Sequence, residues 1–283
     1  MIVCTAEGKR PPAACGEVEL TDQTKSIAVV FLARGADRAW KPSVARFIES
    51  YRRFPAGIDH RLYVIFKGYQ SEADLAEAQA LFAGFDFSPI HLDDNGFDIG
   101  AYIAAARQVR EKSICFLNTN SEIVGPEWLA RLAVKLGEPK VGMVGATGSF
   151  ESNARFNPLF PAFPNVHLRS NAFMLGTELF LSIGGNVVIR DRWDALLFES
   201  GPESLSRQIR ARGLQLLVVG RNGEGYPPEA WSASDTFRQS AQENLLVADN
   251  RTRDYQGLTE KARQAMAQVT WGEYLIANVP RTV

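Results

Sequence analysis

Ile27-Ala-Val-Val-Phe-Leu-Ala33 is a continuous apolar run, and Leu62-Tyr-Val-Ile-Phe66 is a second one. A short unbroken run of this kind is typical of a β-strand buried on both faces, as the strands of parallel sheets are. Arg34-Gly-Ala-Asp37 follows the first run and Lys67-Gly68 follows the second, so both strands are predicted to end in polar turns. These two strands set the expectation for the rest of the chain.

Helices are predicted to alternate with strands around these runs. Val44, Phe47, Ile48 and Tyr51 recur at spacings of three and four, which predicts a helix over 42–54. Further helices are predicted over 71–83, 100–109 and 126–136, and further strands over 88–92, 113–117 and 141–145. Such alternation with short turns predicts an α/β fold, a mostly parallel twisted sheet with helices on both faces.

The pattern changes after residue 148. Residues 151–166 are rich in Asn, Pro and Phe and look irregular. A helix over 203–212, a strand over 214–219 and a final helix capped by Thr259 are predicted beyond them. We expect three regions: an N-terminal arm over 1–25, one α/β domain over 26–250, and a C-terminal helical extension over 251–283.

The bulk composition is that of an ordinary globular protein. The 283 residues are 46% hydrophobic and carry a formal net charge of −1, so no overall field would draw nucleic acid or anionic lipid to the chain. No apolar run approaches the roughly 18 residues that span a bilayer, and no secretory signal is recognised. Three cysteines without CxxC spacing argue against a disulfide framework and a zinc site. We expect a cytoplasmic protein without a nucleic-acid partner, and peripheral contact with a membrane stays open.

Candidate binding residues lie at or just after the ends of four predicted strands. They are Ala33 and Arg34, Lys67, Asp94 and Asp98, and Asn118 and Asn120. Because ligands bind at the carboxyl ends of parallel strands, these positions predict a nucleotide-diphosphate pocket. Taken alone, Asp, Asn and Gly are ordinary turn residues, and Asp98 also suits a helix start.

Two segments carry a resemblance to a known family. Asn95-Gly-Phe-Asp-Ile-Gly-Ala-Tyr102, and Phe116-Leu-Asn-Thr-Asn-Ser121 followed by Pro126-Glu-Trp-Leu129, resemble the nucleotide-binding segments of GT-A glycosyltransferases over about residues 26 to 220. With His167-Leu-Arg-Ser-Asn-Ala-Phe173, the likeness is strongest to a bacterial branch that modifies rhamnan-type or capsular polysaccharides. The resemblance implies a GT-A-like domain, a nucleotide-diphosphate sugar as donor and a saccharide or lipid-linked acceptor.

The resemblance also implies a divalent cation, Mg²⁺ or Mn²⁺, held by a DxD motif. This chain has Asn118-Thr119-Asn120 at that position, and amide oxygens are weaker ligands than carboxylates. Asn120 and Asp98 are the expected metal ligands, and Asp93 and Asp94 are other candidates. Two alternatives stay open: Arg or Lys offsets the diphosphate charge without metal, or catalysis has been lost.

The resemblance further implies a catalytic base shortly before a helix that ends in Gly213. An inverting transfer needs a carboxylate that takes the proton of the acceptor hydroxyl. In Phe198-Glu-Ser-Gly-Pro-Glu-Ser-Leu-Ser-Arg-Gln-Ile-Arg-Ala-Arg-Gly213 the candidates are Glu199 and Glu203. We prefer Glu199, since a first-turn carboxylate favoured by the helix dipole already explains Glu203.

Four further residues are candidates for binding the acceptor. His167, Arg169 and Asn171 alternate along an extended segment and are predicted to point one way. Trp231 is a candidate for stacking on a sugar ring. The competing explanations are a solvated edge strand for the first three and ordinary packing for Trp231.

Three classes of function compete. The leading hypothesis is a glycosyltransferase of surface-polysaccharide assembly, and the second is an inactive GT-A-like domain that binds sugar nucleotide or a partner protein. The third, a doubly wound oxidoreductase, is disfavoured because no GxGxxG turn follows the first strand.

Overall fold

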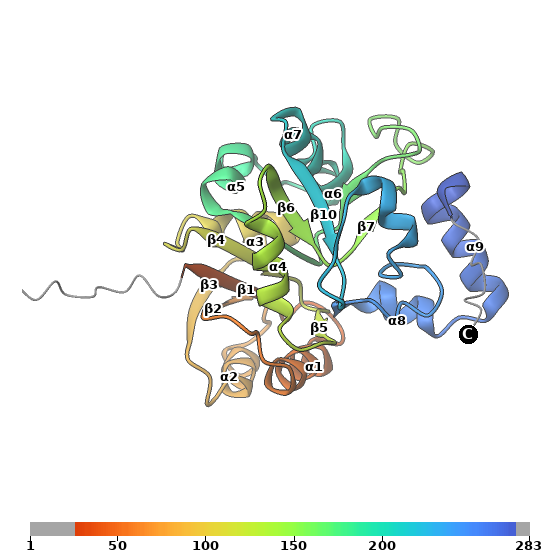
Figure 1. Cartoon of the computed structure of the whole chain (residues 1–283). Coiled ribbons are helices and arrows are strands. Elements are labelled where there is room, and N and C mark those ends of the chain that lie inside the picture. The colour runs from red at the N-terminus through yellow and green to blue at the C-terminus, as the bar shows by residue number, and fades with distance from the viewer. Residues whose placement is uncertain (1–25, 276–283) are drawn as a thin grey trace, which may run out of the picture.

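The computed structural model describes residues 26–275 (Figure 1). Its centre is an eight-stranded sheet with strand order β11-β10-β6-β9-β4-β1-β2-β3. The strands are β1 (Ile27–Arg34), β2 (Arg61–Lys67), β3 (Phe87–Leu92), β4 (Ser113–Leu117), β6 (Val141–Gly145), β9 (Ala172–Gly176), β10 (Gln215–Val219) and β11 (Gly225–Tyr226). β9 runs antiparallel to both its neighbours and β11 antiparallel to β10, while the remaining pairings are parallel. The predicted α/β class with a mostly parallel sheet is confirmed.

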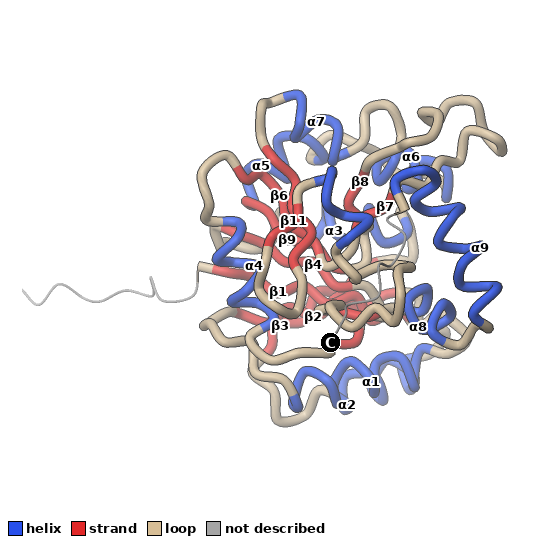
Figure 2. Tube along the Cα trace, turned by 45° about the vertical axis from the view of Figure 1, so that its right-hand side comes forward, coloured by secondary structure: helices blue, strands red, loops and turns tan. Residues whose placement is uncertain are grey.

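Helices cover both faces of this sheet, as predicted (Figure 2). α1 (Trp40–Arg53), α2 (Glu72–Leu81) and α4 (Trp128–Leu136) share one core with Val29 and Phe31 of β1. α3 (Phe97–Ala106), α5 (Thr177–Gly184), α6 (Arg192–Ser200) and α7 (Leu205–Ala211) share the other core with Val30 and Leu32. Successive residues of a strand point to opposite faces, so the all-apolar run of β1 supplies both cores at once.

The antiparallel strand β9 was not predicted. It determines where the segment that precedes it lies. It lies between β4 and β6, with Leu117 of β4 opposite Ala172. The backbone amide of Asn118 continues this pairing by donating to the carbonyl of Asn171 at 3.0 Å. The segment 167–171 therefore lies beside the residues that follow β4.

Two short strand pairs and the C-terminal helices complete the described chain. β5 (Glu122–Ile123) pairs with β12 (Val247–Ala248), and β7 (Gly148–Ser149) pairs with β8 (His167–Leu168). The remaining helices are η1 (Pro228–Ala233), α8 (Asn250–Gln256), α9 (Glu260–Trp271) and η2 (Gly272–Tyr274). Trp271 anchors α9, because it is buried and its Nε1 donates to the carbonyl of Phe237 at 3.0 Å.

One predicted domain limit lies at the edge of the described residues, and the other lies inside a helix. The N-terminal arm over 1–25 and the end of the C-terminal extension, 276–283, lie outside the described residues. The limit proposed after residue 250 falls within α8. Of the predicted helices, 100–109 begins earlier, at Phe97, because Gly96 takes a left-handed conformation (φ 74°) and ends the preceding turn. The helix predicted over 203–212 begins later, at Leu205.

Candidate active site at the strand ends

Three of the residues predicted at the strand ends form one cluster of charges. The guanidinium of Arg34 donates to both carboxylate oxygens of Asp94, at 2.8 and 2.7 Å, and to Asp37 at 2.8 Å. The Nζ of Lys67 lies 3.5 Å from Asp94. The hydrogen bonds from Arg34 are the main reason that the pKa of Asp94 is held below its usual value. Arg34 is therefore already neutralised by two carboxylates.

Lys67 has a positioning role in this cluster. Its side chain is fully buried, and its Nζ donates to the carbonyls of Asn95 and Phe97 at 2.7 and 2.8 Å. Burial lowers the pKa of this ammonium group, and the nearby Asp94 opposes that effect. Lys67 thus holds the loop that leads into α3 and sets the place of Asp98.

The two asparagines at the DxD position bind the protein itself. The Oδ1 of Asn118 accepts from the backbone amide of Asn120 at 3.0 Å and from Ser121 Oγ at 3.1 Å. The Oδ1 of Asn120 accepts from Ser43 Oγ at 3.3 Å. Both amide oxygens therefore serve the turn after β4 and its contact with α1.

Asp98 and Glu199 flank Ser170, although they come from different helices. The backbone amide of Ser170 donates to Glu199 Oε1 at 2.7 Å, and its hydroxyl donates to Asp98 Oδ2 at 3.3 Å. Asp98 Oδ1 accepts from the backbone amide of Ile99. Burial, and after it the charge of Glu199, raises the pKa of Asp98. Asp98 therefore keeps a proton to higher pH than an exposed aspartate does.

Two adjoining cavities meet at these carboxyl groups. The strand-end cavity, about 410 Å³, lies where β1, β4, α3 and α6 come together and is lined by Arg34, Asn118 and Asn120 among others. The loop-side cavity, about 640 Å³, extends from there to the loop after β7 and to α8 and α9. The residues that line both cavities are Asp98, Asn118, Ser170, Arg192, Leu196 and Glu199.

His167, Arg169 and Asn171 all line the loop-side cavity. His167 is buried and its Nδ1 bonds to the carbonyl of Asn165 at 2.7 Å, so Nδ1 carries the proton of the neutral ring. Burial lowers the pKa of His167, with the charge of Glu199 acting in the opposite direction. Arg169 is neutralised by the buried Asp249, since Nη2 lies 2.7 Å from Oδ2.

The side-chain amide of Asn171 has a donor group without a hydrogen-bond partner among residues 26–275. Its Oδ1 accepts from Thr147 Oγ1 at 2.7 Å, but its buried Nδ2 has no acceptor within residues 26–275. A buried donor without a partner is costly, and an acceptor atom supplied by a ligand or by water would satisfy it.

Five predicted residues line neither cavity: Lys67 and Asp94, described above, and Ala33, Trp231 and Glu203. Ala33 is fully buried in the core beside α1, and its carbonyl accepts from the hydroxyl of Tyr69 at 3.2 Å. Trp231 is also fully buried, and its Nε1 donates to the carbonyl of Tyr226 at 2.8 Å. Glu203 is exposed just before α7. Packing explains Trp231 without a role in sugar stacking.

Arg192 was missed by sequence reasoning and is the most informative addition. It lies in the first turn of α6, is exposed, and lines both cavities. No carboxylate or hydrogen-bond acceptor among residues 26–275 pairs with its guanidinium. Its position depends on α6 reaching the carboxyl edge of β1 and β4, and no local signal in the sequence predicts that approach.

The donor groups at the predicted metal site do not fit a divalent cation. The oxygens of Asn118 and Asn120 accept hydrogen bonds from the protein, and both oxygens of Asp98 do so as well. Asp94 is bound by Arg34. Within the described part of the chain, no three His, Cys, Asp or Glu side chains gather in a way that could hold a metal ion. Hard cations need several such oxygens free to coordinate.

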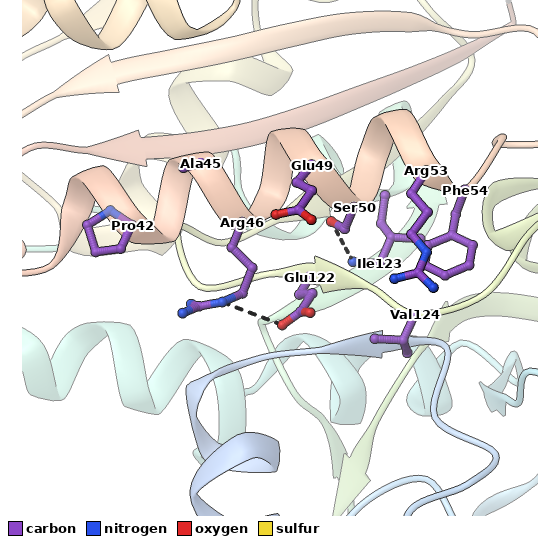
Figure 3. Close-up of a pocket in the computed structure, with 10 residues that line it drawn as sticks. All are labelled: Pro42, Ala45, Arg46, Glu49, Ser50, Arg53, Phe54, Glu122, Ile123 and Val124. Atoms are coloured by element: carbon purple, nitrogen blue, oxygen red, sulfur yellow. Dashed lines mark hydrogen bonds and ion pairs between the residues drawn. The ribbon is translucent and has the colours of Figure 1, made fainter.

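A third hollow, about 490 Å³, lies between α1 and β5 and shares no lining residue with the other two (Figure 3). Several of its polar groups bind one another: Arg46 lies 3.7 Å from Glu122, and Ser50 Oγ accepts from the amide of Ile123 at 3.1 Å. We assign no chemistry to it.

No protein-family model matches the sequence, and no curated protein is similar to it in sequence. Among solved structures, the chain is similar to a mannosyltransferase from Pyrobaculum calidifontis in complex with GDP-Man and Mn²⁺ (TM-score 0.47, 14% identity, 74% of this chain and 59% of that one). It is also similar to mouse xyloside xylosyltransferase 1 (TM-score 0.40, 13% identity, 66% and 82% covered). A third is 4-diphosphocytidyl-2C-methyl-D-erythritol synthase from Anaerococcus prevotii (TM-score 0.43, 9% identity, 68% and 87% covered).

The chain thus spans about three fifths of the length of the mannosyltransferase. With TM-scores below 0.5 and identities of 14% or less, none of these likenesses identifies the family or the activity of this chain. Between residues 26 and 275, no helix has the length and hydropathy needed to cross a bilayer.

Proposed function

We propose that this chain is a glycosyltransferase of the GT-A type that moves a sugar from a nucleotide-diphosphate donor to a saccharide or lipid-linked acceptor. The observation that carries the proposal is the pair of cavities that meet at Asp98, Ser170 and Glu199. A group transfer between two substrates needs two binding spaces that open on the same reactive groups.

The donor is proposed to occupy the strand-end cavity. This space lies at the carboxyl edge of parallel strands, where α/β proteins bind nucleotides. The departing diphosphate needs positive charge, and the donor set described above does not fit a metal ion. Arg34 is neutralised by Asp94 and Asp37. The guanidinium of Arg192, which has no partner in the described part of the chain, is the proposed source of that charge.

The acceptor is proposed to occupy the loop-side cavity, with Glu199 as the base. The acceptor oxygen attacks the anomeric carbon, the bond from that carbon to the diphosphate oxygen breaks, and the diphosphate leaves with the bonding electrons. Glu199 takes the hydroxyl proton. Its Oε1 is held by the amide of Ser170, while Oε2 has no donor among the described residues. This assignment applies to a transfer that inverts the anomeric centre.

The pair of carboxyl groups supports this division of roles. Asp98 has a raised pKa and therefore holds its proton to higher pH than an exposed aspartate does, which argues against Asp98 as the base. Assembly of a surface polysaccharide by a cytoplasmic enzyme is the setting that we propose, because the sequence resembles the branch that modifies rhamnan-type or capsular polysaccharides.

An inactive domain that binds sugar nucleotide is the second candidate. Asn118 and Asn120 favour it, because their oxygens are engaged in the turn after β4 and replace the carboxylates of the family motif. Turnover separates the two candidates, since both predict that nucleotides bind.

Nucleotide binding is tested by thermal stabilisation with UDP, GDP, CDP and dTDP, each with Mn²⁺ and with EDTA. A ligand present at 100 times its Kd should stabilise the protein by about 2.7 kcal/mol. We expect one nucleotide to raise the melting temperature equally in both conditions. No shift with any nucleotide would refute the proposal, and a shift that requires Mn²⁺ would refute the role of Arg192.

Glu199→Gln tests the assignment of the base. Glutamine keeps the size of the side chain and can still accept from the amide of Ser170, but it cannot take a proton. We expect turnover to fall by about 10²- to 10⁴-fold with unchanged nucleotide affinity. Glu203→Gln is the matched control, because Glu203 lies outside both cavities. Unchanged turnover in Glu199→Gln would show that another group is the base.

A further inference from the structure

The loop-side cavity is lined, at the loop after β7 and at α8, by two arginines that form no ion pair with the residues between 26 and 275. Arg155 comes from the loop after β7, and Arg251 comes from α8. Both are exposed, and neither guanidinium pairs with a carboxylate in the described part of the chain. Of the four acidic residues that line the cavity, Asp249 binds Arg169 at 2.7 Å and Glu151 binds Arg238 at 2.6 Å, while Asp98 and Glu199 lie where it meets the strand-end cavity. This end of the cavity therefore has an excess of positive charge.

Apolar side chains lie next to these cations. Phe156, Phe163 and Val269 line the same cavity and are 65%, 39% and 65% exposed. The guanidinium of Arg155 sits 4.4 Å from the centre of the Phe156 ring, so a cation and an exposed aromatic face occupy one place on the rim. Exposed apolar groups that gather at a cavity mouth mark a binding surface more often than singly scattered ones do.

A third group in the cavity also calls for an acceptor atom. Asn171 is 1% exposed, and its Nδ2 has no hydrogen-bond partner among residues 26–275. Two guanidinium groups and an amide donor on one cavity, beside apolar groups, suit a ligand that has several acceptor oxygens and an apolar part.

We propose that the loop-side cavity takes an acceptor that carries a phosphate next to an apolar chain, with the phosphate at Arg155 and Arg251 and the chain against Phe156, Phe163 and Val269. This inference rests on the proposed function and names the chemical class of its acceptor. Phosphate suits the pair of arginines because its oxygens can accept from two guanidinium groups at the same time.

The test uses three probes of the protein in solution, without nucleotide. Dodecyl phosphate below its micellar concentration has both the anion and the chain, dodecyl maltoside has the chain alone, and inorganic phosphate has the anion alone. Isothermal titration calorimetry measures the Kd of each. We expect dodecyl phosphate to bind at least about tenfold more tightly than either other probe.

Two double variants locate the binding. Arg155→Ala with Arg251→Ala should weaken the binding of dodecyl phosphate by at least about tenfold and leave that of dodecyl maltoside unchanged. Arg110→Ala with Arg210→Ala removes the same charge from two exposed arginines that line neither cavity, and should change nothing. Equal affinity in the two double variants would overturn the inference.

The probes also separate the sources of affinity. Inorganic phosphate that binds as tightly as dodecyl phosphate would overturn the amphiphilic acceptor, since an anion alone would then account for the site. Dodecyl maltoside that binds as tightly would overturn the role of the phosphate. Nucleotide titrations of the same variants distinguish a failure of the acceptor class from a failure of the proposed function. Unchanged nucleotide binding with no effect on dodecyl phosphate would refute the acceptor class alone.

Discussion

Asp249→Asn is the most informative test of how the acceptor side of the site is held together. Asp249 is 1% exposed. Its Oδ2 accepts from Arg169 Nη2 at 2.7 Å, and its Oδ1 accepts from the amide of Thr252 at 2.9 Å as the N-cap of α8. Asparagine retains the cap acceptor and the shape of the side chain, so the substitution removes the negative charge and the oxygen that accepts from Arg169 and leaves the cap in place.

The expected cost follows from the charge that remains. Breaking a buried pair by removing one partner costs about 3–5 kcal/mol, because the other charge is left uncompensated. The side chain of Arg169 is 11% exposed, but it still donates to Thr147 Oγ1 at 3.3 Å and lies 4.2 Å from the centre of the Phe237 ring. These remaining contacts place the expected loss near the lower limit, about 3 kcal/mol at pH 7.

The pH dependence of this loss has a definite sign. Burial alone would raise the pKa of Asp249, but the charge and hydrogen bonds of Arg169 and Thr252 hold it below its usual value. A carboxyl with a depressed folded pKa contributes stability that is present above the unfolded pKa, about 3.9, and is lost as pH falls through the folded pKa. The difference between wild type and variant should therefore be constant from pH 7 to about 5 and shrink below about pH 4.

Urea unfolding followed by tryptophan fluorescence measures this difference. Asp254→Asn is the matched control, since Asp254 is exposed on the same helix and forms no ion pair with the described residues. We expect the control to lie within about 0.5 kcal/mol of wild type. A loss below about 1 kcal/mol in Asp249→Asn, with an unchanged dependence on urea, would refute the view that this pair holds Arg169 in the cavity wall.

Three other substitutions test the electrostatics of the site. Asp98→Asn should stabilise the protein at pH 7 by on the order of 1 kcal/mol, because a carboxyl with a raised folded pKa loses stability as pH rises; a lower urea midpoint would contradict this. His167→Asn keeps a donor near the Nδ1 position but does not titrate. Because burial lowers the folded pKa of His167, wild type should lose more stability than this variant as pH falls below about 6.5, and parallel pH profiles would rule out that linkage. Arg192→Ala should weaken nucleotide binding by about tenfold in calorimetric titrations, whereas Arg190→Ala, an exposed arginine outside both cavities, should not; equal Kd values would remove Arg192 from the donor site.

The amino-acid sequence by itself predicted the sheet apart from β9 and β11, and most of its helices. The apolar runs at Ile27 and Leu62 have no polar face, so they suit only strands covered on both sides, and the observed core confirms this. Arg34, Asp98 and Asn118 could be placed at one cavity because parallel strands end at a common edge. Local pattern and chain direction are enough for such a prediction.

Only the tertiary structure decided which charges remain available. Pairing depends on contacts between distant segments, such as Arg34 with Asp94 or Arg169 with Asp249, and no local pattern predicts them. The antiparallel strand β9 inserts between β4 and β6 and so brings Ser170 between Asp98 and Glu199. The guanidinium of Arg192, which none of residues 26–275 pairs, likewise depends on the tertiary structure, because the charges that surround a side chain come from distant segments of the chain.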